Sequence, residues 1–415
     1  MTRELVTEFG DREIGRLLRS PNGRTSFVYD DAYRRSETAR PLSLSMPLGL
    51  TEHGRATVEA FLWGLLPDNE LILERWAKRF RVSARNPFAL LEHVGADCAG
   101  AVRFVSAARP ETRSADLGAI QFVLRRGIAE RLRALAGDAS AWRAPADEGQ
   151  FSLGGAQPKI ALWSDGKRWG VPYGRTPTTY ILKPGVAGLD GHAENEHFCL
   201  SLARGLGMPV AASRVLHFED QVAIVVERYD RRVSRDGVER VHQEDVCQAL
   251  AVPPSKKYES AGGPGVKAVA ALLREHSGAP DEDIGTFVDS LAYSWLIAGT
   301  DAHAKNYSLL IGERGRVRLA PLYDLASALP YRHLAVHKLK LAMKIGGKYR
   351  LREIGAHQWG KFAGEIGSDG GRGAGATGST TGSFLTGSGS GKGGGAAATE
   401  LTVPQSGQAG RLTGS

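Results

Sequence analysis

Hydrophobic and polar positions follow different periods along the chain, and these periods predict its elements. Short runs rich in β-branched and aromatic residues near the N-terminus predict three strands, at 4–9, 25–30 and 42–48. Apolar residues then recur every three or four positions, which predicts two helices, at 56–66 and 69–80. Residues 1–110 are therefore predicted to form a small α/β subdomain.

The pattern changes twice after this first part. Residues 111–149 include a stretch with few large apolar residues and are predicted to be a connector. A basic amphipathic stretch at 123–136 is typical of a solvated helix face rather than of a nucleic-acid site. From residue 150 to residue 366 we predict a second domain.

This second domain begins with strand patterns and ends with helical ones. Residues 151–163 read as a strand, a glycine turn and a second strand, and further strands are predicted at 178–185 and 221–230. Helices are predicted at 194–207, 266–276 and 284–299. Residues 367–415 are rich in glycine and serine without any period, and we predict that they are disordered.

The composition limits the classes of protein without choosing among them. Hydrophobic residues make up 42% and charged residues 24%, as in globular chains. The 53 Lys and Arg against 45 Asp and Glu give a net charge of +8, which suits a nucleotide, nucleic-acid or acidic protein partner but equally a basic surface with none. Three scattered cysteines form no zinc pattern, and we find no signal peptide or membrane-length apolar run. We predict a cytoplasmic protein without membrane contact.

The strongest candidate chemistry is in TDAHAKN, residues 300–306. Asp301 and Asn306 have the D-x-x-x-x-N spacing of a kinase catalytic loop, in which the acid faces the substrate hydroxyl and the amide holds Mg²⁺. Asp324 follows at the end of an apolar stretch and would be a second hard oxygen ligand. Taken alone, each acid also fits a structural role, Asp301 in a turn or helix C-cap and Asp324 as an N-cap.

Two lysines could meet phosphate groups. Gly154 and Gly155 would let backbone N–H groups approach phosphate oxygens, and Lys159 follows them, although a glycine pair between strands is more commonly a simple hairpin. Lys183 lies among strand-forming residues, where burying an isolated charge is costly, and Glu196 on the next predicted helix could pair with it. An edge-strand lysine and a solvated glutamate are the alternative for this pair.

The order of these candidates favours phosphoryl transfer over separate structural roles. A Mg²⁺–ATP kinase site requires a glycine turn, a lysine, a glutamate, an aspartate, an asparagine and a second aspartate. Walker-A spacing is absent, which argues against a P-loop NTPase. His303 has no second His or Cys nearby, so zinc is not expected.

Many segments resemble the HipA serine/threonine-protein kinases, the toxin half of HipA–HipB type II toxin–antitoxin systems. The segments are ARPLSLSMPL, GLLPDN, NPFALLEHVGADCAGAV, FSLGGAQPKIAL, TPTTYILKP, NEHFCLSLARGLG, VVERYDRR, QEDVCQALAVPPSKKYESAGGPG, TDAHAKNYSLL and LAPLYDLASA. The resemblance runs from about residue 1 to about residue 365. It implies an α+β, HipA-like two-lobed kinase fold with an N-terminal α/β subdomain and a mainly helical C-terminal lobe.

The resemblance also implies ATP and Mg²⁺ as cofactors and a role for each matching residue. The mobile phosphate loop would be Gly154, Gly155, Ala156, Gln157, Pro158 and Lys159, and the hinge facing adenine Glu227, Arg228 and Tyr229. Lys183 would hold the α/β-phosphates, Asp301 would be the catalytic acid/base, and Asn306 and Asp324 would bind Mg²⁺. Further nucleotide neighbours would be His303, Ala304, Lys305 and Tyr323.

Ser152 matches the loop serine that such kinases autophosphorylate. Adding a charge of about −2 beside a phosphate-binding turn should expel the loop and inactivate the kinase. The implied partners are a HipB-like helix-turn-helix antitoxin, operator DNA mainly through that antitoxin, and a protein substrate, for which the resemblance suggests an aminoacyl-tRNA synthetase for glutamate.

The sequence departs from the family at its C-terminus, where HQWGKFAGEIG gives way to glycine-rich sequence instead of further helices. Our hypothesis is a frameshift or degenerate gene end, with a natural linker as the alternative, and the change puts direct DNA contact in doubt. Two rival functions therefore stay open: a catalytically impaired protein that acts only as an antitoxin-binding corepressor, and a small-molecule kinase on the same site.

Overall fold

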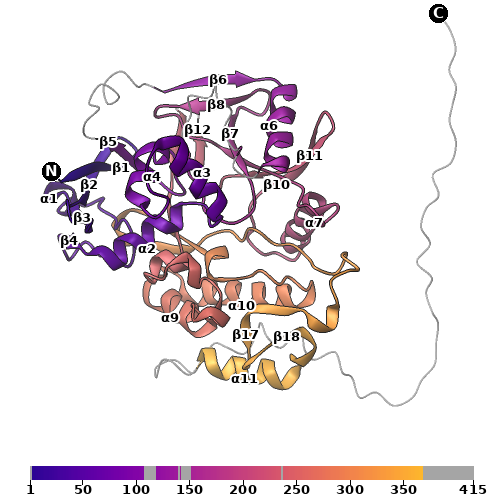
Figure 1. Ribbon diagram of the computed structural model, residues 1–415. Helices are drawn as coiled ribbons and strands as arrows, with labels where there is room; N and C mark the ends of the chain where they lie inside the picture. The colour runs from indigo at the N-terminus through magenta and orange to yellow at the C-terminus, as the bar shows by residue number, and fades with distance from the viewer. Residues whose placement is uncertain (1, 107–117, 139–140, 142–150, 235–236, 368–415) are drawn as a thin grey trace, which may run out of the picture. The chain divides into compact units, whose positions relative to one another are not determined.

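The computed structural model describes residues 2–106, 118–138, 141, 151–234 and 237–367, all of which belong to one compact unit, Met1–Asp369 (Figure 1). The tail that we predicted to be disordered, residues 367–415, lies outside the described residues except for Gly367.

The N-terminal part is built on a five-stranded antiparallel sheet in the order β4-β3-β2-β1-β5. Its strands are β1 (Arg3–Phe9), β2 (Arg12–Arg19), β3 (Thr25–Tyr29), β4 (Glu52–His53) and β5 (Val102–Ser106). The accompanying helices are α1 (Asp31–Arg34), α2 (Arg55–Leu65), α3 (Glu70–Phe80) and α4 (Pro87–Val94). Asn69 and Asn86 cap α3 and α4 by accepting backbone N–H groups, which explains where these helices begin.

The strands predicted at 4–9 and 25–30 and both predicted helices are confirmed, but the strand predicted at 42–48 is wrong. There the chain turns, with the Met46 N–H donating to the Ser43 carbonyl at 2.9 Å. Leu42 and Met46 are both buried, and Pro41 and Pro47 offer no N–H for a ladder. The sequence pattern also missed β2, in which four charged residues interrupt the apolar positions.

A six-stranded antiparallel sheet follows, in the order β10-β11-β9-β7-β8-β6. Its strands are β6 (Ala119–Val123), β7 (Ile160–Ser164), β8 (Trp169–Tyr173), β9 (Tyr180–Pro184), β10 (Ser213–Phe218) and β11 (Gln221–Glu227). Helices α6 (Arg125–Gly137) and α7 (His192–Gly205) accompany it. Residues 151–153, predicted as a strand before the glycine turn, form none.

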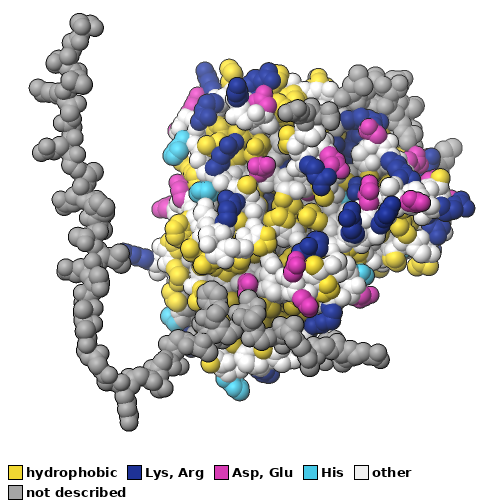
Figure 2. Space-filling view, turned by 180° about the vertical axis from the view of Figure 1, so that it is seen from behind, with side chains coloured by type: hydrophobic (Ala, Val, Ile, Leu, Met, Phe, Trp, Pro, Cys, Tyr) yellow, Lys and Arg dark blue, Asp and Glu magenta, His cyan; other side chains and the backbone are white. Residues whose placement is uncertain are grey.

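Residues 111–149, which we predicted to be a connector, include strand β6 of this sheet and the accompanying helix α6. Helix α6 buries an apolar stripe that includes Ile128 and Leu132, while Arg126 on the opposite face pairs with Glu130 at 3.1 Å in solvent. On the face of the molecule shown in Figure 2, Lys and Arg side chains are interspersed with Asp and Glu.

The C-terminal part is mainly helical, and its described residues also form three small sheets. Its helices are α8 (Val246–Ala249), α9 (Val266–His276), α10 (Pro280–Leu296) and α11 (Ala356–Gly367), with short 3₁₀ turns between them. The strands are β12 (Arg231–Ser234) and β13 (Gly237–Arg240), then β14 (His242–Asp245), β15 (Ser308–Ile311) and β16 (Val317–Leu319), then β17 (Lys340–Ile345) and β18 (Lys348–Arg350).

Buried side chains form two hydrophobic cores. The first extends over the five-stranded sheet and the inner strands of the six-stranded sheet, from Leu5 to Val225. The second joins α7 and part of β11 to the C-terminal helices, from Ala193 to Phe362. Strand β11 contributes to both cores, so the segment that follows it connects the two parts of the molecule.

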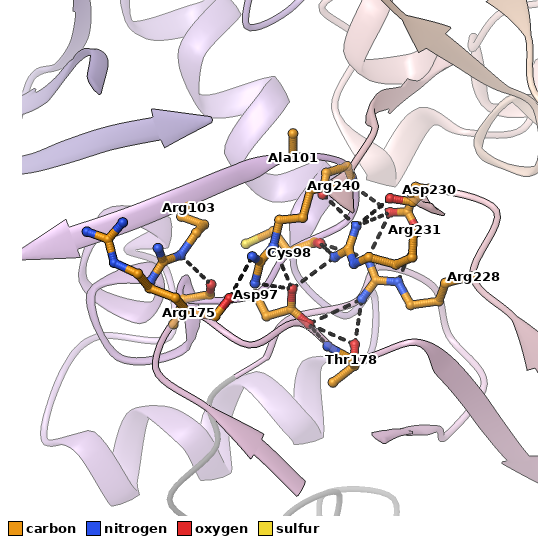
Figure 3. A network of polar contacts seen from close by, with 12 residues as sticks. Asp97, Cys98, Ala101, Arg103, Arg175, Thr178, Arg228, Asp230, Arg231 and Arg240 are labelled. Atoms are coloured by element: carbon orange, nitrogen blue, oxygen red, sulfur yellow. Dashed lines mark hydrogen bonds and ion pairs between the residues drawn. The ribbon is translucent and has the colours of Figure 1, made fainter. Parts of the chain in front are cut away.

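Residues of this connecting segment, among them Arg228 and Asp230, take part in a buried network of ion pairs (Figure 3). The Asp97 carboxylate accepts hydrogen bonds from Arg231 and Arg240 and lies 3.4 Å from Arg228. Asp230 accepts two further bonds from Arg228, at 2.8 and 3.0 Å. Burial alone would raise the pKa of Asp97, but the three guanidinium groups outweigh it and hold the pKa well below its ordinary value.

Replacing Asp97 with Asn is expected to lower the free energy of unfolding by ~3–5 kcal/mol, because buried arginines lose their counter-charge. Because the pKa of Asp97 is depressed in the folded protein, its ionised carboxylate stabilises the fold at pH values above the ordinary carboxyl pKa of about 4. This stabilisation is lost as the pH falls toward the pKa of Asp97 in the folded state. Denaturant unfolding should therefore show that the difference in free energy of unfolding between wild type and Asp97→Asn becomes smaller from pH 7 to pH 3. Asp220→Asn, which removes an exposed partner of Arg133, should change little.

Candidate active site

A cavity of about 400 Å³ is lined by residues of both cores. It brings together the predicted candidates from the glycine loop, β9, α7, the end of β11, the loop after α10 and the segment around Asp324. Every predicted site residue lines the cavity except Ser152, Pro158 and Ala304. Residues more than 150 positions apart in sequence therefore meet at one site.

An ion-pair triad from β9, α7 and the segment around Asp324 lines the cavity. Lys183 on β9 donates to Glu196 on α7 at 2.8 Å and also to Asp324. Burial alone would raise the pKa of Asp324, but the Lys183 and Lys159 ammonium groups lower it to about 2. Burial raises the pKa of Glu196 against the opposing effect of Lys183. The predicted pairing of Lys183 with Glu196 is confirmed, and the alternative of an edge-strand lysine is wrong because Lys183 is buried.

Asp324 is not the N-cap that its sequence position also allowed. No helix begins in residues 325–335, which follow it directly, and its backbone is left-handed with φ of 54°. Aspartate tolerates this conformation better than most residues, and it directs the carboxylate toward Lys183.

The loop after α10 presents Asp301 and Asn306 to the same cavity. The Asn306 side-chain amide donates to the Asp301 carbonyl at 2.7 Å, and the Tyr258 hydroxyl donates to Asp301 Oδ1 at 2.5 Å. His303 Nε2 lies 3.8 Å from the same carboxylate oxygen, and burial lowers the pKa of its imidazole. The Asp301 side chain is 64% exposed, so a group arriving from solvent can reach it.

The glycine loop approaches the N-terminal part closely. A Cβ at Gly154 would lie 2.6 Å from the Gly64 carbonyl oxygen, and Gly155 has φ of 103°, so both positions favour glycine. Lys159 Nζ donates to the Gly154 carbonyl at 2.7 Å, and burial lowers the pKa of Lys159 to about 8. Within the described residues no carboxylate forms an ion pair with Lys159, which is the setting of an anion site.

The predicted hinge has one residue whose side chain is engaged elsewhere. Arg228 directs its guanidinium into the network with Asp97 and Asp230 (Figure 3), which leaves only its backbone for a ligand in the cavity. Tyr229 is stacked on Tyr323 with ring centroids 5.9 Å apart. The third hinge candidate is Glu227, an exposed residue at the end of β11.

Other residues of the cavity were not predicted to take part. They include Asp68, Gln243, Asp245, Gln248 and Lys257. Tyr258, which does not line the cavity but donates to Asp301, was not predicted either. Several lie in segments that carry the family resemblance, GLLPDN and SKKYESAGGPG, but no spacing within the sequence links them to the Asp301 loop. The family motifs therefore marked these segments in the sequence, but they assigned no role to the charged residues within them.

Ser152 does not line the cavity. It is fully buried, its hydroxyl donates to the Leu65 carbonyl at 2.7 Å, and its N–H donates to the Asp97 carbonyl at 2.9 Å. A phosphate group has no room at this position, so any modification of Ser152 requires the loop to move.

Several buried polar atoms at the cavity have no hydrogen-bond partner among the described residues. They include Glu196 Oε2, His192 Nδ1 and His303 Nδ1. Buried polar groups are rarely left unsatisfied, so these atoms fit a polar ligand such as a nucleotide phosphate with its cation.

Comparison with known proteins identifies the family. Residues 151–381 match the family model of the HipA-like C-terminal domain, and residues 6–105 match that of the HipA N-terminal domain. The chain belongs to the HipA family.

Individual HipA relatives agree with this assignment. Y4mE of Sinorhizobium fredii is 36% identical over 375 residues, which cover 88% of this chain and 87% of that protein. The serine/threonine-protein kinase toxin HipA of Shewanella oneidensis is 31% identical over 388 residues, covering 88% and 84%. The solved Shewanella oneidensis complex of HipA, HipB and operator DNA matches with a TM-score of 0.75 at 28% identity, over 88% of this chain and 84% of that chain.

The predicted family, the α+β HipA-like fold and the kinase class are thereby confirmed. The chain is a serine/threonine protein kinase of the HipA family, and membership of a kinase family implies ATP as the phosphoryl donor. Within the part of the chain that the structure describes, no helix is long and apolar enough to cross a bilayer. No group of three His, Cys, Asp or Glu there could hold a metal ion by itself. The cytoplasmic location stays a prediction.

Proposed function

We propose that this HipA-family kinase is the toxin of a HipA–HipB-type module and phosphorylates a serine or threonine of a translation-related protein. The observation that carries the proposal is the convergence of Asp301, Asn306, Asp324 and Lys183 at one cavity. These are the acid, the two metal ligands and the phosphate-binding lysine that a protein kinase requires.

The lysines are suited to hold the nucleotide phosphates. Lys183 is buried and fixed by Glu196, as expected of a lysine that pairs with the α/β-phosphates. Lys159 lies at the other side of the glycine loop, held by a carbonyl rather than by a carboxylate, so its charge is available to an anion.

Asp324 and Asn306 would hold Mg²⁺. One carboxylate and one amide oxygen, completed by phosphate oxygens and water, match the sparse protein ligation that Mg²⁺ accepts. The pKa of about 2 keeps Asp324 ionised at neutral pH, which metal ligation requires. A bound Mg²⁺ would neutralise charge on the transferred phosphoryl group.

Asp301 would accept the proton of the attacking hydroxyl. The Tyr258 hydroxyl fixes its carboxylate, and its exposure leaves room for a hydroxyl on a protein surface. A small-molecule kinase would enclose its acid more fully, so the exposure favours a protein substrate over the small-molecule alternative.

Autophosphorylation of Ser152 is part of the proposal. The buried position of this hydroxyl supports a model in which the loop leaves its site before modification and, once modified, does not return. This would switch the kinase off.

The proposed partners are a HipB-like antitoxin and, through it, operator DNA, because the Shewanella oneidensis relative forms a complex with both. The substrate suggested by the family resemblance is a glutamate–tRNA ligase. Expression of this chain alone should arrest bacterial growth and add phosphoserine or phosphothreonine to one or a few proteins, and co-expression of the antitoxin should restore growth.

The same experiment separates the toxin from the corepressor alternative. Asp301→Ala should bind the antitoxin but neither arrest growth nor change the phosphoproteome. If wild type and Asp301→Ala give the same growth and the same phosphoproteome, while both bind the antitoxin, the chain acts only as a corepressor.

A further inference from the structure

The end of α2 and the turn that follows it, residues 64–68, lie directly against the glycine loop. The Asp68 N–H donates to the Gly155 carbonyl at 3.1 Å, and Pro67 and Gly155 form a single parallel bridge. The Ser152 hydroxyl donates to the Leu65 carbonyl at 2.7 Å. Ser152 and Gly155 of the phosphate-loop region are therefore hydrogen-bonded to a segment of the N-terminal part for which the sequence predicted no role in the site.

Asp68 also carries a charge into the cavity. Its Oδ1 accepts from Lys305 at 2.6 Å and its Oδ2 from Lys257 at 2.8 Å, with the carboxylate 11% exposed. Burial alone would raise the pKa of Asp68, but the two lysines outweigh it and lower the pKa. The Asp68 side chain is thus a charged, nearly buried bridge between two cations.

One of these two lysines lies in the loop that carries Asp301, and the other lies in a segment that contacts this loop. Lys305 lies inside the 301–306 loop, and the Lys257 carbonyl accepts the Ala304 N–H at 3.2 Å. Lys257 is followed directly by Tyr258, whose hydroxyl holds Asp301. The main chain of Asp68 therefore holds the phosphate loop, while its side chain holds the loop of the proposed catalytic acid.

We propose that residues 64–68 form a clamp that holds the phosphate loop and the catalytic loop in register, with Asp68 as a positioning residue for phosphoryl transfer. The proposal rests on the proposed kinase mechanism and deepens it. It makes the N-terminal part a component of the active site, because the clamp is the point at which that part touches both loops. The clamp also retains Ser152, so its opening is the movement that would expose this hydroxyl.

The test compares Asp68→Asn with Glu70→Gln, which removes an exposed carboxylate two residues away. Amide exchange read by mass spectrometry needs no catalysis, so a failure of the kinase proposal cannot be confused with a failure of this one. In Asp68→Asn we expect the Ser152 and residue-68 amides to exchange about 10-fold faster or more, while the β1 and α10 amides keep their wild-type rates. Glu70→Gln should match wild type throughout.

Catalysis gives a second readout. With Mg²⁺–ATP, Asp68→Asn should lose roughly 100-fold in kcat/KM, as expected when reacting groups are misplaced, and Asp68→Glu should recover part of it. Wild-type exchange rates at Ser152 and residue 68 in a folded Asp68→Asn would overturn the proposal, whatever the activity. If Asp68→Asn does not fold, native-state amide exchange of the wild-type protein tests the proposal instead. The Ser152 and Asp68 amides should then become exposed together, as one cooperative unit, in low denaturant. Independent opening of these two amides would refute the clamp.

Discussion

Asp301→Ala is expected to lower kcat for phosphoryl transfer by about 10²- to 10⁴-fold, the usual contribution of a general base. The carboxylate is positioned by Tyr258 and faces solvent, so its loss removes the proton acceptor without removing a buried contact. Thermal unfolding should therefore change little. The measurement is the initial rate of phosphate incorporation at saturating Mg²⁺–ATP.

The matched control for this variant is Glu313→Gln. Glu313 is an exposed acid in the turn between β15 and β16, outside the cavity, and its replacement should leave kcat unchanged. An Asp301→Ala protein that keeps its fold and its wild-type rate would show that another group accepts the proton.

Lys183→Met is expected to affect both stability and activity. Without the ammonium group, Glu196 and Asp324 remain as close carboxylates in a buried site, which should lower the free energy of unfolding by ~3–5 kcal/mol. In wild type, the ionised Asp324 carboxylate stabilises the fold at pH values above the ordinary carboxyl pKa of about 4. This stabilisation is lost as the pH falls toward the Asp324 pKa of about 2 in the folded protein. Urea unfolding at several pH values should show the difference from wild type narrowing below pH 4.

A double variant separates the two effects. Adding Glu196→Gln to Lys183→Met removes one of the stranded charges and should restore part of the stability, yet phosphoryl transfer should stay lost because no lysine meets the phosphates. Lys167→Met, in the exposed turn between β7 and β8, should match wild type in both assays. Recovery of activity in the double variant would contradict the role given to Lys183.

The chemistry of the site was predictable where it depends on short spacing. Asp301 and Asn306 lie in one loop, and Lys183 and Glu196 lie on a consecutive strand and helix, so local pattern was sufficient to place each pair. Both pairs line the cavity, although their chemical roles stay predictions.

The missed features depend on contacts between distant segments. Asp68 meets Lys305 across 237 positions and Arg228 meets Asp97 across 131, and no local period encodes such a meeting. At residues 42–48 the local pattern was misleading instead. Its alternating apolar residues predicted a strand, but a turn buries Leu42 and Met46 there. Strand β6, predicted as connector, forms because β8 offers it an edge.

Phosphoryl transfer at this cavity can be measured by intact mass and peptide mapping after incubation with Mg²⁺–ATP, with Asp301→Ala treated in parallel. We expect one added phosphate on Ser152 of the wild-type protein and none on the variant. A folded wild-type protein that binds ATP but gains no phosphate on any residue would contradict this expectation.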